Sequence, residues 1–185
     1  MTCISYDDLQ SAASQRSLTL LGGFHPDKDE VGLEDCRTLL MVGPDERHFW
    51  PRFLRSDEYL DGRPDPVDRW SIRVVGDLAT IAGARALYPF GDAPYLPFYQ
   101  WALRTQNIHI SPVRLLVSDD HGLFVSFRGA LSLPHRIDLP AAVPSPCIPC
   151  ATKPCLAACP VDAMGDHEYS DDACRAHVRS SDGHG

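Results

Sequence analysis

The sequence predicts an α+β protein: a mixed, mostly antiparallel sheet with flanking helices, followed by a small C-terminal cysteine module. In the first 140 residues, short apolar runs that end at glycine or proline alternate with segments whose apolar residues recur at helical spacing. Beyond them, five of the seven cysteines lie between positions 147 and 174. We therefore predict an α+β body at 1–140 and a separate module at 141–185.

The first half of the body contains three predicted elements. Asp7–Gly23 has spaced apolar residues and ends in a glycine pair, which predicts a helix with a glycine stop. Arg37–Gly43 is a short apolar run followed by proline, which predicts a buried strand and a turn. Aromatic residues recur at helical spacing across Asp45–Leu60, where Pro51 lies near the start and is tolerated.

The second half of the body begins with the clearest helical pattern. Asp68–Ala84 has a single apolar stripe, which predicts an amphipathic helix. Arg85–Phe90 predicts another short strand, and a third helix is expected around Phe98 and Trp101.

A hairpin and a linker are predicted at the end of the body. Two apolar runs, Val113–Val117 and Leu123–Leu131, flank a turn that contains Gly122, which is typical of a β-hairpin. The linker is Leu139–Pro146, where three of eight residues are proline. This composition predicts an extended, rather stiff connection to the cysteine module.

The net charge and the lack of long apolar stretches argue against two kinds of partner, nucleic acids and membranes. The formal net charge of -8 argues against a nucleic-acid partner, because binding phosphate chains requires a basic surface. No stretch approaches the roughly 20 apolar residues of a membrane span, and the first residues lack the pattern of a secretory signal. We therefore expect a cytoplasmic protein without a membrane partner. Thiols stay reduced in that compartment, so the clustered cysteines indicate metal ligands rather than disulfides.

The cysteine array predicts an iron–sulfur site. Its spacing is C-x2-C-x4-C-x3-C-P, formed by Cys147, Cys150, Cys155 and Cys159. The usual bacterial run, C-x2-C-x2-C-x3-C-P, brings several thiolates to one cluster with the same short spacings and the same final proline. The array has two extra residues between its second and third cysteines, and its C-x3-C-P end is unchanged. We predict a 4Fe-4S cluster held by these thiolates.

Three alternatives to a cluster stay open. A structural zinc site usually has two C-x2-C pairs well apart in the sequence, whereas this array is compact. A redox dithiol at Cys147 and Cys150 would leave Cys155 and Cys159 without a role. The cysteines could also be core residues brought together by chance.

Cys174 raises the question of a second cluster. In two-cluster ferredoxins the fourth cysteine of a run ligates the other cluster. That pattern assigns Cys147, Cys150 and Cys155 to one cluster, and Cys159 with Cys174 to a second. No cysteine follows Cys174, so either the chain is a truncated form of a longer protein or one cluster forms on four of the five thiolates. We favour truncation.

The remaining cysteines and the histidines give weaker signals. Cys3 and Cys36 have no spaced partner and are expected to be free thiols. The eight histidines show no H-x-x-H spacing. Only His177, three residues after Cys174, is close enough in sequence to tune a cluster.

Two family resemblances add to these patterns. The tail, with its C-x2-C pair, PCLAACPVDAM and the later YSDDACRAH, resembles the ferredoxin module of epoxyqueuosine reductases and reductive dehalogenases. Those families join a cobalamin-binding body of nitroreductase-like fold to a two-cluster module. The body, over roughly 97–140 (FYQWALRTQNIHISPVRLLVSDDHGLFVSFRGALSLPHRIDLP), resembles cobalamin-processing proteins of the cblC class. The resemblances imply a ferredoxin-like module and a nitroreductase-like body that binds cobalamin.

Three functions follow as hypotheses. The first is an electron-transfer protein whose body docks a redox partner protein. The second is an oxidoreductase whose body binds cobalamin or a flavin and receives electrons from the cluster. The third is a non-catalytic metal-binding protein. The chain lacks a G-x-G-x-x-G or G-x-x-x-x-G-K-[ST] loop, which argues against dinucleotides and nucleoside triphosphates. It also has no counterpart of the acidic residue that acts as general acid in the queuosine enzymes, so their activity is not implied.

Overall fold

The computed structural model describes residues 4–27, 30, 32–165 and 169–183. The chain forms two compact units. The first unit contains the described residues up to Ile108 together with Val125–Val143. The second unit contains His109–Phe124 and the described residues from Pro144 onward.

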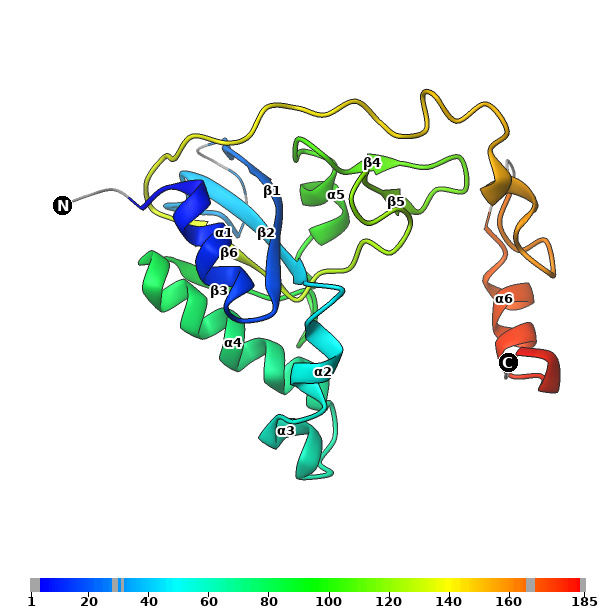
Figure 1. The fold of residues 1–185 in the computed structure, drawn as a ribbon, viewed down its shortest axis with the longest axis horizontal. Coiled ribbons are helices and arrows are strands. Elements are labelled where there is room, and N and C mark those ends of the chain that lie inside the picture. The colour runs from blue at the N-terminus through cyan, green and yellow to red at the C-terminus, as the bar shows by residue number, and fades with distance from the viewer. Residues whose placement is uncertain (1–3, 28–29, 31, 166–168, 184–185) are drawn as a thin grey trace. The chain divides into compact units, whose positions relative to one another are not determined.

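An antiparallel sheet of four strands forms the centre of the first unit (Figure 1). Its order is β1-β2-β6-β3, and each neighbouring pair is antiparallel. The strands are β1 (Leu18–Phe24), β2 (Thr38–Pro44), β3 (Arg85–Leu87) and β6 (Gly129–Leu133). This arrangement confirms the predicted α+β class with its mostly antiparallel sheet and flanking helices, and it confirms the strands predicted at 37–43 and 85–90.

Five helices accompany the sheet among the described residues of the first unit. They are α1 (Tyr6–Ser14), α2 (Phe49–Phe53), α3 (Asp57–Leu60), α4 (Pro66–Ala82) and α5 (Phe98–Ala102). The long helix α4 confirms the amphipathic pattern: proline occupies its first turn and Gly83, with a φ of 58°, ends it. The helix expected around Trp101 is also present, as the five residues of α5.

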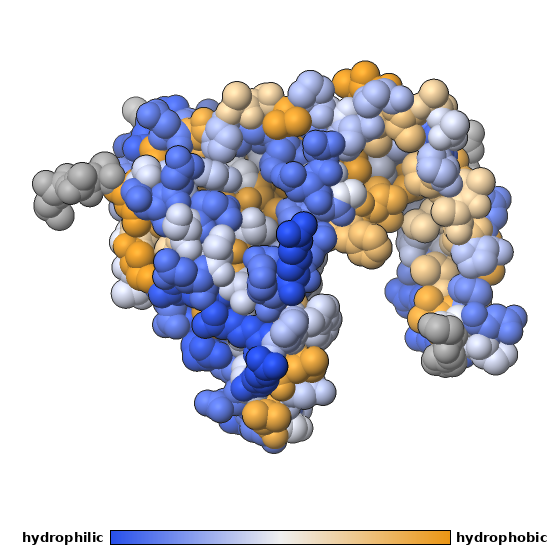
Figure 2. Space-filling model, in the orientation of Figure 1, coloured by the Kyte–Doolittle hydropathy of each residue, from blue (hydrophilic) through white to orange (hydrophobic). Residues whose placement is uncertain are grey.

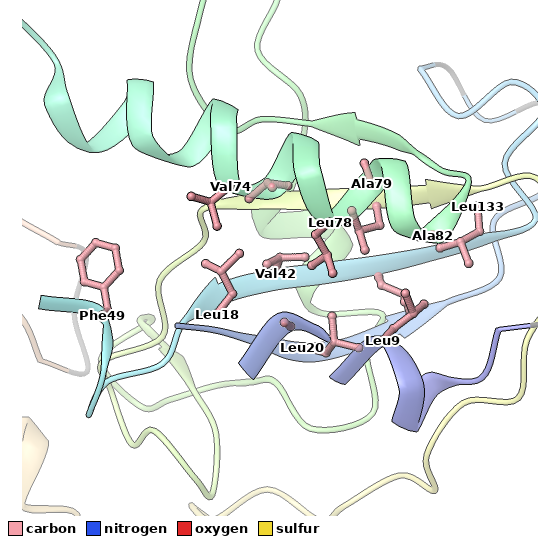
Figure 3. Close-up of a cluster of buried hydrophobic side chains, with 14 of the residues drawn as sticks. Leu9, Leu18, Leu20, Val42, Phe49, Val74, Leu78, Ala79, Ala82 and Leu133 are labelled. Atoms are coloured by element: carbon pink, nitrogen blue, oxygen red, sulfur yellow. The ribbon is translucent and has the colours of Figure 1, made fainter. Parts of the chain in front are cut away.

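The core lies between the sheet and the helices α1 and α4 (Figure 3). Leu9 of α1 and Val74 and Leu78 of α4 meet strand residues such as Val42 in one buried cluster. Neighbouring residues of a strand point to opposite faces, so Leu39 and Met41 lie on the other face of β2. Both are also fully buried. Burial on both faces explains why β2 appears in the sequence as a continuous apolar run.

The predicted helix at 7–23 is wrong in its second half. A capping box at Ser5 starts α1, which ends at Ser14, and the chain then reverses through Ser17, whose φ is 59°. The next residues form β1 instead of continuing the helix. At Gly23 an added Cβ would lie 2.5 Å from the Leu39 carbonyl oxygen, so the glycine permits close contact between strands. It is no helix stop.

The predicted hairpin between 113–117 and 123–131 is also wrong. The first run contributes β5 (Leu116–Val117), which pairs with β4 (His109–Ile110) in the second unit. The second run contributes to β6, which pairs with β2 and β3 in the first unit. All residues of β6 are buried. A strand in the centre of the sheet is covered on both faces, whereas a hairpin with one face in solvent would leave every second residue exposed. The predicted turn itself is present, because Gly122 has a φ of 54° and Ser118 pairs with it.

Two other predictions are modified. The single helix expected across 45–60 is two short helices, because Ser56 interrupts it and caps α3 through a hydrogen bond from the Tyr59 N–H. The linker at 139–146 has no helix or strand, as expected, and its Val143 N–H donates to the Gln106 carbonyl at 2.8 Å.

In the described part of the chain, no helix has the length and apolar character that crossing a bilayer requires.

Candidate metal centre

The five candidate ligands lie in the second unit, mostly in loops. Cys155 lies in the short 3-10 helix η1 (Pro154–Ala157), and Cys174 lies in α6 (Asp171–Val178). The other three, Cys147, Cys150 and Cys159, lie outside helices and strands. All five thiols are free and partly exposed. They are therefore reachable by a metal ion or cluster, which a fully buried thiol is not.

A turn at Ser145 holds the first cysteine of the array. The Ser145 hydroxyl accepts a hydrogen bond from the Cys147 N–H at 3.3 Å, and its carbonyl accepts one from the Ile148 N–H at 3.0 Å. Both bonds bend the backbone at the start of the C-x2-C pair. Side-chain bonds of this kind are typical of serine in tight turns.

A second turn accommodates the longer spacing between Cys150 and Cys155. Lys153 has a φ of 41°, in the left-handed region, and Pro154 follows at the first position of η1. The Lys153 carbonyl accepts the Leu156 N–H at 3.1 Å. The two extra residues are therefore taken up in a defined turn, and they do not displace the C-x3-C-P end.

The Cys159 thiol is surrounded by backbone donors. The Val161 N–H lowers the pKa of this thiol most, and the N–H groups of Ala163 and Met164 lower it further, so that it lies below its ordinary value of 9.0. The bond from the Ala163 N–H to Cys159 Sγ is 3.2 Å long. A left-handed residue at Asp162, with a φ of 50°, turns the chain so that these groups surround the sulfur. Such donors favour a thiolate, which is the form that binds metals.

Tyr169 lies beside Cys174, and its segment is bonded to the segment that follows Cys159. A hydrogen bond with the Cys174 thiol raises the pKa of Tyr169, and the nearby charges of Cys174 and Cys159 raise it further. The two segments are joined by a bond from the Ser170 N–H to the Ala163 carbonyl at 3.0 Å, and Ser170 caps α6. The structure thus brings two of the five predicted ligands to the same neighbourhood.

The full array is not gathered at metal-binding separation. Across residues 4–27, 30, 32–165 and 169–183, no three His, Cys, Asp or Glu side chains form a group that could hold a metal ion. Metal binding commonly closes ligand loops, because binding and folding are coupled. The five thiolates nonetheless suit a soft metal, since sulfur ligands select iron–sulfur clusters, zinc or copper(I).

The isolated cysteines differ from the array. Cys36 is a free thiol with 5% of its surface exposed, and burial raises its pKa. This environment makes it an inert core residue. Cys3 lies outside the described residues. His177, in α6, is one turn beyond Cys174.

Sequence reasoning missed Tyr169 and the donors that surround Cys159. The only sequence signal for Tyr169 is its position five residues before Cys174, and backbone donors have no sequence signal beyond Pro160. No model of a known protein family matches the chain, and no match was found among curated proteins or among solved structures. The assignment of the metal centre therefore depends on the residues of this chain alone.

Proposed function

We propose that the chain binds one 4Fe-4S cluster and passes single electrons to a redox partner protein. The observation that carries the proposal is the C-x2-C-x4-C-x3-C-P array, together with the backbone N–H groups around the Cys159 thiol. Compact thiolate spacing and N–H donors to sulfur are both characteristic of cluster sites. A bound cluster would supply reversible one-electron chemistry at this site.

The chain's own residues have distinct parts in this proposal. Cys147, Cys150 and Cys155 provide three ligands, and Cys159 or Cys174 provides the fourth. Because the bond from the Ser170 N–H to the Ala163 carbonyl joins the segments of these two cysteines, either thiol lies in the same neighbourhood. The N–H groups of Val161, Ala163 and Met164 stabilise negative charge on the sulfur of Cys159.

Electron transfer suits this environment better than catalysis on a substrate. The thiols of the array are partly exposed, and Ile148, between Cys147 and Cys150, is 77% exposed. A cluster held here would lie close to the surface, where a partner protein can approach it. An exposed apolar side chain beside the ligands also provides surface for a weak, transient contact.

The optical spectrum tests this proposal. Protein purified without oxygen and reconstituted with iron and sulfide is expected to be brown, with broad visible absorption that bleaches when dithionite is added, because thiolate-to-iron charge transfer depends on the oxidised cluster. A flavin or cobalamin would instead give its own resolved bands. Colourless protein that carries stoichiometric zinc after the same treatment would contradict the proposal.

A further inference from the structure

A cleft in the first unit is lined by three arginines, a histidine and four uncharged residues. Its volume is about 510 Å³. Its lining residues, which we call the arginine cleft, are Ser17, His48, Pro51, Arg52, Arg55, Ser56, Trp70 and Arg73. They come from α2, α4 and the connecting turns. Figure 2 shows hydrophilic and hydrophobic side chains side by side over the part of this face where Figure 1 places α2 and α3.

One of the three arginines, Arg73, and the histidine are already bonded to carboxylates. His48 Nδ1 lies 2.8 Å from Asp45 Oδ2. Arg73 binds Glu58 through two hydrogen bonds of 2.6 and 3.0 Å, and this contact lowers the pKa of Glu58 from 4.5 to about 2. The Arg73–Glu58 pair therefore adds no net charge to the cleft.

The other two arginines, Arg52 and Arg55, have no carboxylate partner among the described residues. Arg52 donates from Nη1 to the Gln15 carbonyl at 2.6 Å, and no carboxylate among the described residues pairs with it. Arg55 has no side-chain hydrogen bond or ion pair among the described residues. Two guanidinium groups without a bonded carboxylate therefore lie in one cleft of a chain whose formal net charge is -8. The cleft is a local feature and no part of a general basic surface.

The rest of the cleft is rigid. Trp70 is 1% exposed and packs against Phe49 at 5.1 Å between ring centroids. Ser56 donates its hydroxyl hydrogen to the Phe53 carbonyl at 2.7 Å, which fixes that side chain. Pro51 restricts the backbone between His48 and Arg52. The backbone that carries the arginine side chains is thus held by packing and hydrogen bonds. Ligand binding then needs to order only the side chains themselves, which keeps the entropy cost small.

We propose that the arginine cleft binds the phosphate group of a small molecule, with Arg52 and Arg55 as its direct ligands. The planar fork of a guanidinium matches phosphate oxygens through paired hydrogen bonds. Two guanidinium groups that no carboxylate occupies can both bond to the oxygens of a phosphate ester or diphosphate. The chain has no phosphate-binding glycine loop, so side chains rather than backbone N–H groups make the contacts. This binding site is independent of the cysteine array.

Pyrophosphate is the probe for this proposal, measured by titration calorimetry with the full chain at low ionic strength. We expect saturable 1:1 binding that weakens as salt is added. Arg55→Gln is expected to weaken binding by roughly tenfold, since it removes one charge-assisted hydrogen-bonding group. Arg55 has no partner among the described residues, so this change leaves the fold intact. Replacing Arg52 and Arg55 together should abolish binding.

Arg37→Gln is the matched control. Arg37 is exposed, lies outside the cleft and has no side-chain partner among the described residues, so the same loss of charge there should leave the affinity unchanged. Absence of saturable pyrophosphate binding would overturn the proposal. So would equal loss of affinity in the Arg37 and Arg55 variants, because it would show a response to net charge alone.

Discussion

Cys155→Ser is expected to remove the iron–sulfur cluster, with iron after anaerobic reconstitution falling from about four atoms per chain to below one. A hydroxyl is a much poorer ligand for iron than a thiolate. The spare thiol, whichever of Cys159 and Cys174 is not the fourth ligand, lies near that fourth position and not in η1, where Cys155 is held. Cys150→Ser should have the same effect. Iron and acid-labile sulfide, determined side by side with the visible spectrum, measure the loss.

Cys36→Ser is the matched control for these variants. Cys36 is buried beside Ser132 and the backbone of Thr38, so a hydroxyl can take over its hydrogen bonds without reaching any cluster. Its iron content should equal that of the unaltered protein. If the Cys36 variant lost iron while the Cys155 variant kept it, the ligand assignment would be wrong.

Trp70→Ala is expected to lower the free energy of unfolding of the first unit by about 3–5 kcal/mol, the usual cost of removing a buried aromatic side chain. Trp70 makes edge contacts with Phe49 and Phe53, at 5.1 and 6.4 Å between ring centroids, and joins α4 to α2. Its loss leaves a cavity that these helices cannot close without moving. Urea unfolding followed by far-ultraviolet circular dichroism measures the change.

Trp50→Ala provides the control for that prediction. Trp50 contacts the same two phenylalanines, at 5.2 and 5.6 Å, but 56% of its surface is exposed. Its removal should cost no more than about 1.5 kcal/mol. Trp70→Phe keeps a ring in place, so its loss of free energy of unfolding should lie between those of Trp50→Ala and Trp70→Ala. Equal destabilisation by Trp50→Ala and Trp70→Ala would show that the aromatic cluster is not the core of this region.

The sequence predicts well those helices and strands whose secondary structure is determined by residues close together in the chain. The helix α4 has an apolar stripe, an early proline and a terminal glycine, so three local signals agree. Strand β2 is an apolar run bounded by a turn. In both elements most of the residues that are buried in the structure belong to the apolar stripe or the apolar run in the sequence.

The wrong predictions concern segments whose secondary structure depends on contacts with distant parts of the chain. Leu18–Phe24 follows α1 without a proline, and only its place beside β2 makes it a strand. The run before Leu133 resembles one arm of a hairpin, yet β6 pairs with β2 and β3, whose residues lie more than forty positions earlier in the sequence. Pairing over such distances has no local signature.

The same distinction applies to the two sites. The cysteine array is contiguous, so its spacing carries chemical information. The arginine cleft joins Ser17, residues of and after α2, and Arg73 of α4, which only the fold brings together. No spacing rule could have identified it from the sequence.

Iron and acid-labile sulfide per chain, determined on the unaltered protein after anaerobic reconstitution, decide whether the cysteine array holds a cluster. We expect about four of each, the composition of one 4Fe-4S cluster. Two such clusters would need about eight thiolate ligands by the four-cysteine rule, and the chain has seven cysteines. A reproducible value near zero, with one zinc ion bound in its place, would contradict cluster binding. A value near eight would contradict the assignment of a single cluster to the array.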